Sequence, residues 1–170
     1  MSLKETAVMM TRYRAWANAR TYEVVLKAPA EEVTRERKTH FRSITYTLNH
    51  VFVIDDIFRA HLTGTRHSYT SRNTTECPSV QELWQKQQAL DAWYVNYTEG
   101  LHEAALDEVI TFDFVDGGQG AMTRSEMLLH LVSHSQYHRG FVGDMLNQIP
   151  IKPIATDLPV YLRETRTGKD

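Results

Sequence analysis

The chain has 170 residues, a formal net charge of −2 and one cysteine, Cys77. Its sequence pI of about 6.4 lacks the basic footprint of a nucleic-acid-binding protein, and no lysine or arginine run indicates a polybasic membrane contact. No stretch approaches the roughly twenty apolar residues that a membrane span needs, and the first residues do not form a signal peptide. A single cysteine excludes an internal disulfide. We therefore expect one cytoplasmic domain, residues 1–170, that binds neither nucleic acid nor membrane.

Four long segments carry apolar residues at helical spacing, approximately 5–27, 40–61, 78–101 and 123–147. Three of them begin with a capping box, in which glutamate follows a serine or threonine after three positions. The boxes are Ser2 with Glu5, Ser79 with Glu82 and Thr123 with Glu126. Gly64 is a favourable residue for the end of the second segment. These signals predict an all-α fold built from four long helices.

The pattern changes between the third and fourth helical segments. Ile110, Phe112 and Phe114 alternate with polar residues, which is typical of a half-buried strand. The glycine-rich run 116–120 follows and indicates a turn. We expect a small hairpin or an extended crossover here, and a further short helix over about 157–163 in the proline-containing tail.

Two histidines in the last helical segment, His134 and His138, are four residues apart. Residues at this spacing share a helix face, with their Cβ atoms about 5–6 Å apart. At about 100° per residue, both lie at the centre of an apolar seam that includes Met127, Leu131 and Met145. The two imidazoles are therefore predicted to face the core.

A third histidine, His50, shares an inward stripe of the second segment with Ile54 and Ile57. His61 is on the same face, but about 16 Å further along the axis. Burial of imidazoles requires partners for their nitrogens, and neither stripe offers an obvious carboxylate. A shared divalent metal would satisfy His50, His134 and His138 together. The competing interpretation is three core histidines bonded to ordinary polar neighbours, and His130, on the flank, is interpreted as a packing residue or a neighbour of a ligand.

Other side chains of the second segment point away from His50. Asp55 and Asp56 lie at about 140° and −120° from it and are expected to face solvent or an interface. Apolar residues also lie outside the His50 stripe, namely Leu48, Val51, Phe52, Phe58 and Leu62. Such a helix is either central in the fold or pressed against a second subunit, and the latter alternative predicts a homodimer.

Three segments carry a resemblance to a known family. They are Tyr13-Arg14-Ala15-Trp16-Ala17-Asn18, then Leu48-Asn49-His50 followed by Asp55-Asp56, and finally the run 130–140, which reads HLVSHSQYHRG. In these residues the chain resembles the DinB/YfiT family of small metal-binding proteins. The resemblance implies an up-down-down-up four-helix bundle, often a homodimer. It also implies a zinc or nickel ion held by His50, His134 and His138. One departure is Phe141, where the family often has glutamine.

Three neutral histidines leave at least one coordination position open, as in catalytic rather than structural zinc sites. The resemblance implies a transferase or isomerase that uses a low-molecular-weight thiol and acts on a small-molecule substrate. A hydrolase is less favoured because no carboxylate on the histidine stripes can act as a base. The alternative is a non-catalytic, metal-binding stress-response protein. A di-iron carboxylate bundle is rejected, because Glu126 and His130 have the wrong spacing and Glu126 lies off the seam.

Overall fold

The computed structural model describes residues 1–166 and is mostly helical. Its four long helices are α1 (Leu3–Val25), α3 (Ile44–Thr63), α4 (Val80–Gly100) and α5 (Arg124–Asn147). The shorter elements are α2 (Ala30–Thr34), the 3-10 helix η1 (Glu103–Asp107) and α6 (Leu158–Arg166). Strands β1 (Val109–Asp113) and β2 (Gln119–Thr123) form a small sheet. The all-α prediction with a hairpin insertion is therefore correct in outline.

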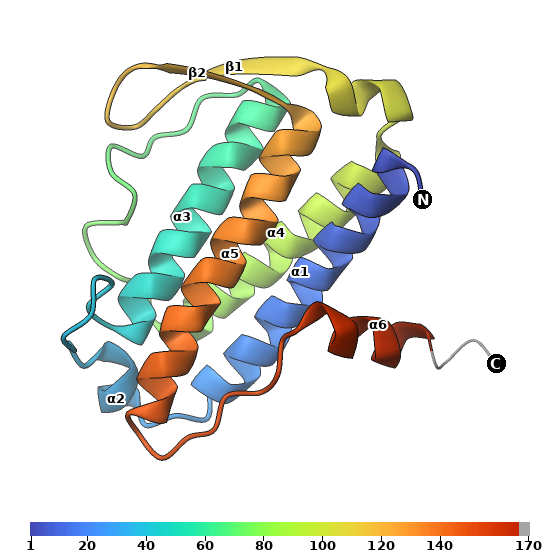
Figure 1. The fold of residues 1–170 in the computed structure, drawn as a ribbon. Helices are drawn as coiled ribbons and strands as arrows, with labels where there is room; N and C mark the ends of the chain where they lie inside the picture. The colour runs from blue at the N-terminus through green and yellow to red at the C-terminus, as the bar shows by residue number, and fades with distance from the viewer. Residues whose placement is uncertain (167–170) are drawn as a thin grey trace.

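The four long helices lie beside one another (Figure 1). Helix α1 packs against α4 and α5, and α3 packs against the same two helices. In Figure 1, α1 and α5 run in one direction along the molecule, and α3 and α4 run in the other. The hairpin lies at one end of the long helices and α2 at the opposite end. A long connection over 64–79 returns from the end of α3 to the start of α4, alongside α3.

The helix starts follow local capping chemistry. All three predicted capping boxes are present, at the starts of α1, α4 and α5. Gly64 ends α3 in the left-handed conformation, with φ of 67°. Helix α3 begins later than predicted, because Ser43 accepts a hydrogen bond from the amide of Tyr46 and forms the N-cap. The short α2 and η1 were not predicted, since five residues give too little periodicity to detect a helix.

The start of α5 provides a test of this capping. Replacing Thr123 with alanine is expected to reduce the free energy of unfolding by about 1 kcal/mol, because the amide of Glu126 then loses its side-chain acceptor. Urea denaturation followed by circular dichroism measures the change. Replacing the nearby exposed Leu129 with alanine is the control, and an equal loss in both variants would argue against a capping effect.

The hairpin differs from the prediction in the position of its turn. The strands are antiparallel, and Phe112 is paired with Gly120. Gly117 and Gly118 have positive φ and form the turn, whereas Gly120 belongs to β2. A Cβ atom at Gly120 would lie 2.6 Å from the ring of Phe112. The glycine in the strand therefore makes room for the aromatic ring that covers it.

A polar layer lies between two of the three apolar parts of the core. One part surrounds the end that carries the hairpin and includes Leu90 and Leu131, and the other surrounds the α2 end and includes Leu83 and Met145. Between them lie buried polar residues from the middle of the long helices, including Arg14, Asn18, Asp55, Gln87, Asp91 and Arg139. The predicted histidines lie at the same level of α3 and α5, so the candidate site borders this layer.

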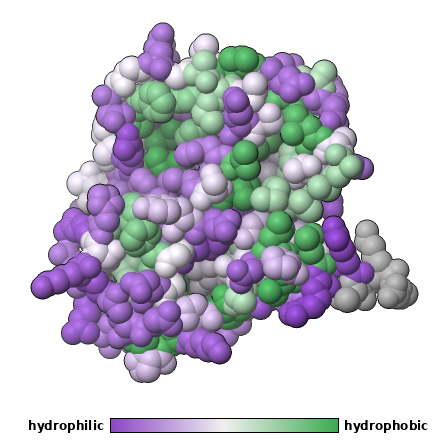
Figure 2. Space-filling view, in the orientation of Figure 1, coloured by the Kyte–Doolittle hydropathy of each residue, from purple (hydrophilic) through white to green (hydrophobic). Residues whose placement is uncertain are grey.

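The apolar residues of α3 that suggested a dimer are covered by the chain itself. Leu48, Val51, Phe58 and Leu62 are each at most 8% exposed, and Phe52 packs against both core parts. Hydrophobic residues on the face shown in Figure 2 occur in small groups among polar ones. The homodimer stays a prediction, to be checked by size-exclusion chromatography with light scattering. Within residues 1–166, no helix combines the length and apolarity required to cross a bilayer.

Candidate metal centre

The fold brings His50, on α3, together with His134 and His138, on α5. One ring nitrogen from each lies within 4.8 Å of the others. The Nε2 atoms of His50 and His134 are 3.2 Å apart, and the ring of His138 is 4.7 Å from His50 and 4.3 Å from His134, between centroids. His138 is 2% exposed, and the other two rings are partly buried. The cluster consists of histidines alone, with no carboxylate among its members in the described chain.

A backbone carbonyl fixes the tautomer of His50. Nδ1 of this ring is 2.9 Å from the carbonyl oxygen of Arg72. Because a carbonyl can only accept, Nδ1 carries the hydrogen, and Nε2 of the neutral ring presents its lone pair to His134. The loop that supplies the carbonyl is anchored on α3, where the side-chain amide of Asn73 donates to the backbone oxygen of Tyr46 over 2.9 Å. Metal-binding histidines commonly have a partner of this kind on the second nitrogen.

Aromatic side chains cover one side of the cluster. Phe41 meets the ring of His138 edge-on at 4.3 Å and lies 5.5 Å from His50. Phe141 contacts Phe41 at 4.9 Å, so the residue that departs from the family pattern supports this cover. Phe41 belongs to the loop before α3, where Arg42 has a φ of 59°, and Phe141 belongs to α5. These aromatic rings therefore pack against one side of the histidine cluster.

Burial lowers the pKa of all three histidines. The pKa of His134 falls to about 2, through burial and the neighbouring His138 and His50. The pKa of His138 falls to about 4, through burial and then His50, and burial also lowers the pKa of His50. The three rings are therefore neutral near pH 7, which is the form that donates a lone pair to a metal.

The donor geometry fits a divalent cation. With zinc–nitrogen bonds of about 2.0–2.1 Å, two ligands of a tetrahedral ion lie about 3.3 Å apart, close to the 3.2 Å between the Nε2 atoms of His50 and His134. A simple histidine–histidine hydrogen bond would account for that distance alone. It would not account for the third ring, which brings a further nitrogen within 4.8 Å of the other two.

The lowered pKa values predict an acid-sensitive metal-free protein. A histidine whose pKa is lower in the folded state stabilises the fold above its unfolded pKa, and this contribution is lost as pH falls through the folded value. The free energy of unfolding should therefore decrease from about pH 6.5 towards pH 4, the window given by His138. Asp55, whose pKa is raised to about 6 by burial, acts in the opposite direction, but it is one group against several histidines.

Urea denaturation of the metal-free protein between about pH 7 and pH 5 tests this expectation. A His138→Leu variant should show a shallower dependence on pH, since the titrating ring is absent. Stability that is constant across this window would contradict the prediction.

The remaining histidines lie outside the cluster. His130 contacts Phe58, with ring centroids 4.7 Å apart, and lies 5.4 Å from the ring of His134, which agrees with a packing role. His61 stacks on Phe112. Cys77 is exposed as a residue, but partial burial of its sulfur raises the pKa of the thiol, so it is not an activated nucleophile.

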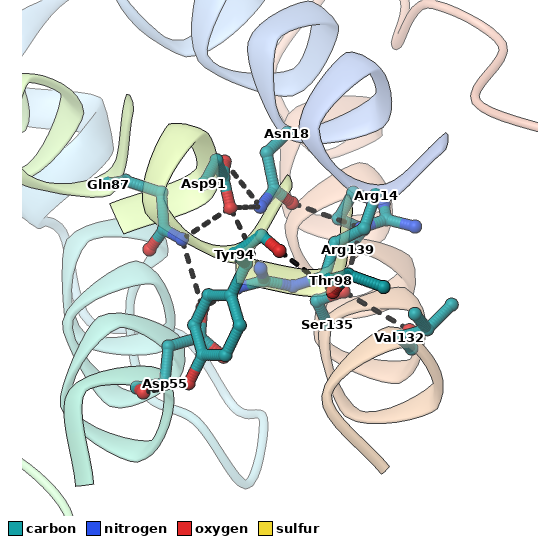
Figure 3. Close-up of polar contacts among 10 residues, drawn as sticks. All are labelled: Arg14, Asn18, Asp55, Gln87, Asp91, Tyr94, Thr98, Val132, Ser135 and Arg139. Carbon is teal, nitrogen blue, oxygen red and sulfur yellow. Dashed lines mark hydrogen bonds and ion pairs between the residues drawn. The ribbon is translucent and has the colours of Figure 1, made fainter. Parts of the chain in front are cut away.

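The prediction for Asp55 was wrong. Asp55 is fully buried and forms an ion pair with Arg14, which also bonds Asp91 at 2.9 Å (Figure 3). Gln87 donates to both carboxylates, over 2.9 and 3.1 Å. Asp55 does point away from His50, as the helical geometry indicated, but that side of α3 faces α1 and α4. Asp56 is partly exposed and accepts a hydrogen bond from Tyr69, over 2.8 Å.

The polar layer extends from these carboxylates to α5. Asn18 donates to Asp91 over 3.0 Å, and Arg139 donates to the side chains of Asn18 and Ser135 over 3.0 and 3.1 Å (Figure 3). Sequence reasoning missed this layer. The available signal was the placement of Arg14 and Asn18 four residues apart in the family-like run of the first helix, facing a run that contains Asp55.

The fold and the site together define a mostly helical protein with a cluster of three histidines contributed by two helices. The sequence matches the profile of the DinB family over residues 1–169, and the chain belongs to this family. It is 25% identical to Protein DinB of Bacillus subtilis (strain 168) over 173 residues, which is 98% of this chain and 99% of that protein. A crystal structure of a DinB-like protein from Bacillus cereus ATCC 10987 has a similar fold, with a TM-score of 0.61. That match has 16% sequence identity and covers 85% of this chain and 91% of the other.

Proposed function

We propose that this protein binds one divalent metal ion, zinc or nickel, through His50, His134 and His138. The observation that carries the proposal is the convergence of three neutral ring nitrogens within 4.8 Å. The carbonyl of Arg72 supports it, because this group directs the lone pair of His50 into the cluster. The proposed framework is an up-down-down-up four-helix bundle that forms a single domain over residues 1–170.

The proposed activity is thiol-dependent transfer or isomerisation of a small molecule. A bound divalent cation with an open position lowers the pKa of a thiol that reaches it. The chain itself supplies three uncharged donors, which leave the full charge of the ion available to the thiol. Because the cluster contains no carboxylate, the site offers no evident base for activating water. This favours a low-molecular-weight thiol over water as the nucleophile.

The test uses protein prepared without a histidine tag. Elemental analysis should find about one zinc or nickel per chain, and the loaded protein should turn over an electrophile with at least one member of a panel of small thiols. Turnover should be lost in His134→Ala and retained in His61→Ala, whose ring lies outside the cluster. The absence of metal after incubation with zinc and nickel would overturn the proposal.

The alternative is a non-catalytic metal-binding protein of the stress response. The aromatic cover formed by Phe41 and Phe141 favours it, because this cover narrows the approach to the histidines. Stoichiometric metal without turnover for every thiol in the panel would select this alternative. Turnover that depends on His134 would reject it.

A further inference from the structure

A small cavity adjoins both the histidine cluster and the polar layer. Its volume is about 10 Å³, at the lower limit for a cavity that holds one water molecule. Its lining includes Tyr22, Gln87, His138 and Arg139, contributed by α1, α4 and α5. These four side chains are 2%, 1%, 2% and 8% exposed, respectively. The lining thus combines buried polar side chains with the apolar side chains of Leu48, Val51 and Val142.

Each of these four residues has a buried polar atom without a hydrogen-bond partner among residues 1–166. The atoms are Oη of Tyr22, Oε1 of Gln87, Nδ1 of His138, and Nε and Nη2 of Arg139. The remaining side-chain polar atoms of Gln87 and Arg139 form hydrogen bonds within the protein. The amide nitrogen of Gln87 donates to Asp55 and Asp91, and Nη1 of Arg139 donates to Asn18 and Ser135 (Figure 3). Buried polar atoms are rarely left unpaired in folded proteins, so unpaired atoms on four residues of one cavity indicate a common ligand.

We propose that the cavity binds one water molecule, which connects His138 to the polar layer. The ligand must donate a hydrogen bond to Oε1 of Gln87, which can only accept, and accept one from Arg139, which can only donate. An anion cannot donate to Gln87, and a metal cation is repelled by Arg139. Water meets both demands, and its second donor and second acceptor positions serve Tyr22 and Nδ1 of His138.

When Tyr22 accepts the second hydrogen of this water, the water accepts the hydrogen of Nδ1 of His138. We assign this arrangement, because Nε2 of the neutral ring then carries the lone pair that a metal requires. The carbonyl of Arg72 has the same effect on His50. Tyr22 and Gln87 are then positioning residues, because they act on the metal ligand His138 through the water. The consequence for metal binding rests on the proposed function, whereas the water site does not.

The wild-type protein provides the first test. In the metal-free form, nitrogen-15 spectra of the imidazole rings should show His138 with hydrogen on Nδ1, and a crystal structure at about 1.5 Å resolution should show one water in the cavity. A dry cavity, or a His138 ring with hydrogen on Nε2, would overturn the proposal. If His138 carries hydrogen on Nδ1 and the cavity holds a water, but the protein binds no metal, the water site is supported and the proposed function is rejected.

Tyr22→Phe tests the positioning role. Oη of Tyr22 has no other partner, so this change removes one bond of the water and little else. Zinc affinity should fall about tenfold, as it does when groups that orient metal ligands are removed, and the Nδ1–H form of His138 should decrease. Tyr94→Phe is the matched control, because it removes a buried hydroxyl that donates to the backbone of Asp55, away from this cavity. Equal zinc affinity in wild type and Tyr22→Phe would contradict the role.

Discussion

Replacing Arg14 with methionine is expected to lower the free energy of unfolding by about 3–5 kcal/mol, as when one partner of a buried ion pair is removed. Arg14 is 1% exposed, and its guanidinium is the cation that faces both Asp55 and Asp91. Methionine keeps much of the packing volume but leaves two carboxyl groups, 0% and 3% exposed, beside each other. Burial raises the pKa of Asp55 to about 6, even though the positive charge of Arg14 lowers it. Without the guanidinium, ionised carboxylates at these positions are strongly disfavoured.

The loss is a large share of the roughly 5–15 kcal/mol that stabilises an ordinary domain. It is measured by urea denaturation followed by circular dichroism near pH 7. Arg12→Met is the matched control, because Arg12 is on the same helix and pairs with Glu99 at 2.7 Å, but the two side chains are 56% and 38% exposed. This exposed pair should contribute at most about 1 kcal/mol. Similar losses in the two variants would show that the polar layer does not depend on the buried charge.

The difference between these two arginines could not be predicted from the sequence. Both lie in the first helix, and each has an acidic partner more than forty residues away in the chain. A single helix gives the direction of each side chain around its own axis, but the surroundings depend on the neighbouring helices. Asp55 was misplaced for this reason. Its angle from His50 was correct, yet α3 is covered on that side as well.

Features that depend on local chemistry were predicted well. The capping boxes at Ser2, Ser79 and Thr123 begin α1, α4 and α5, and Gly64 ends α3, because each motif satisfies backbone groups within a few residues. The approach of His50 to His134 and His138 was inferred from apolar stripes, which identify the inward face of each helix. The aromatic cover from Phe41 was not inferred, since it depends on the path of an irregular loop.

Replacing His134 with alanine is expected to weaken zinc binding at least about 100-fold. Nε2 of His134 is 3.2 Å from Nε2 of His50, and the centroid of its ring is 4.3 Å from that of His138. Alanine removes one of three donors, and no carboxylate in the cluster can replace it. Loss of a group that merely orients a ligand typically weakens binding by about 10–100-fold, so loss of the ligand itself should exceed that range. Titration of untagged protein with zinc in competition with a chelator measures the affinity.

His130→Ala is the matched control, because His130 is one helical turn from His134 and its ring is 5.4 Å away. His130 packs against Phe58 and lies outside the cluster. Its removal should leave zinc affinity within about tenfold of wild type, the lower limit for a neighbour that only supports a ligand. If His130→Ala lost as much affinity as His134→Ala, the ion would have to lie one turn closer to the hairpin. Undiminished binding in His134→Ala would remove this histidine from the metal centre altogether.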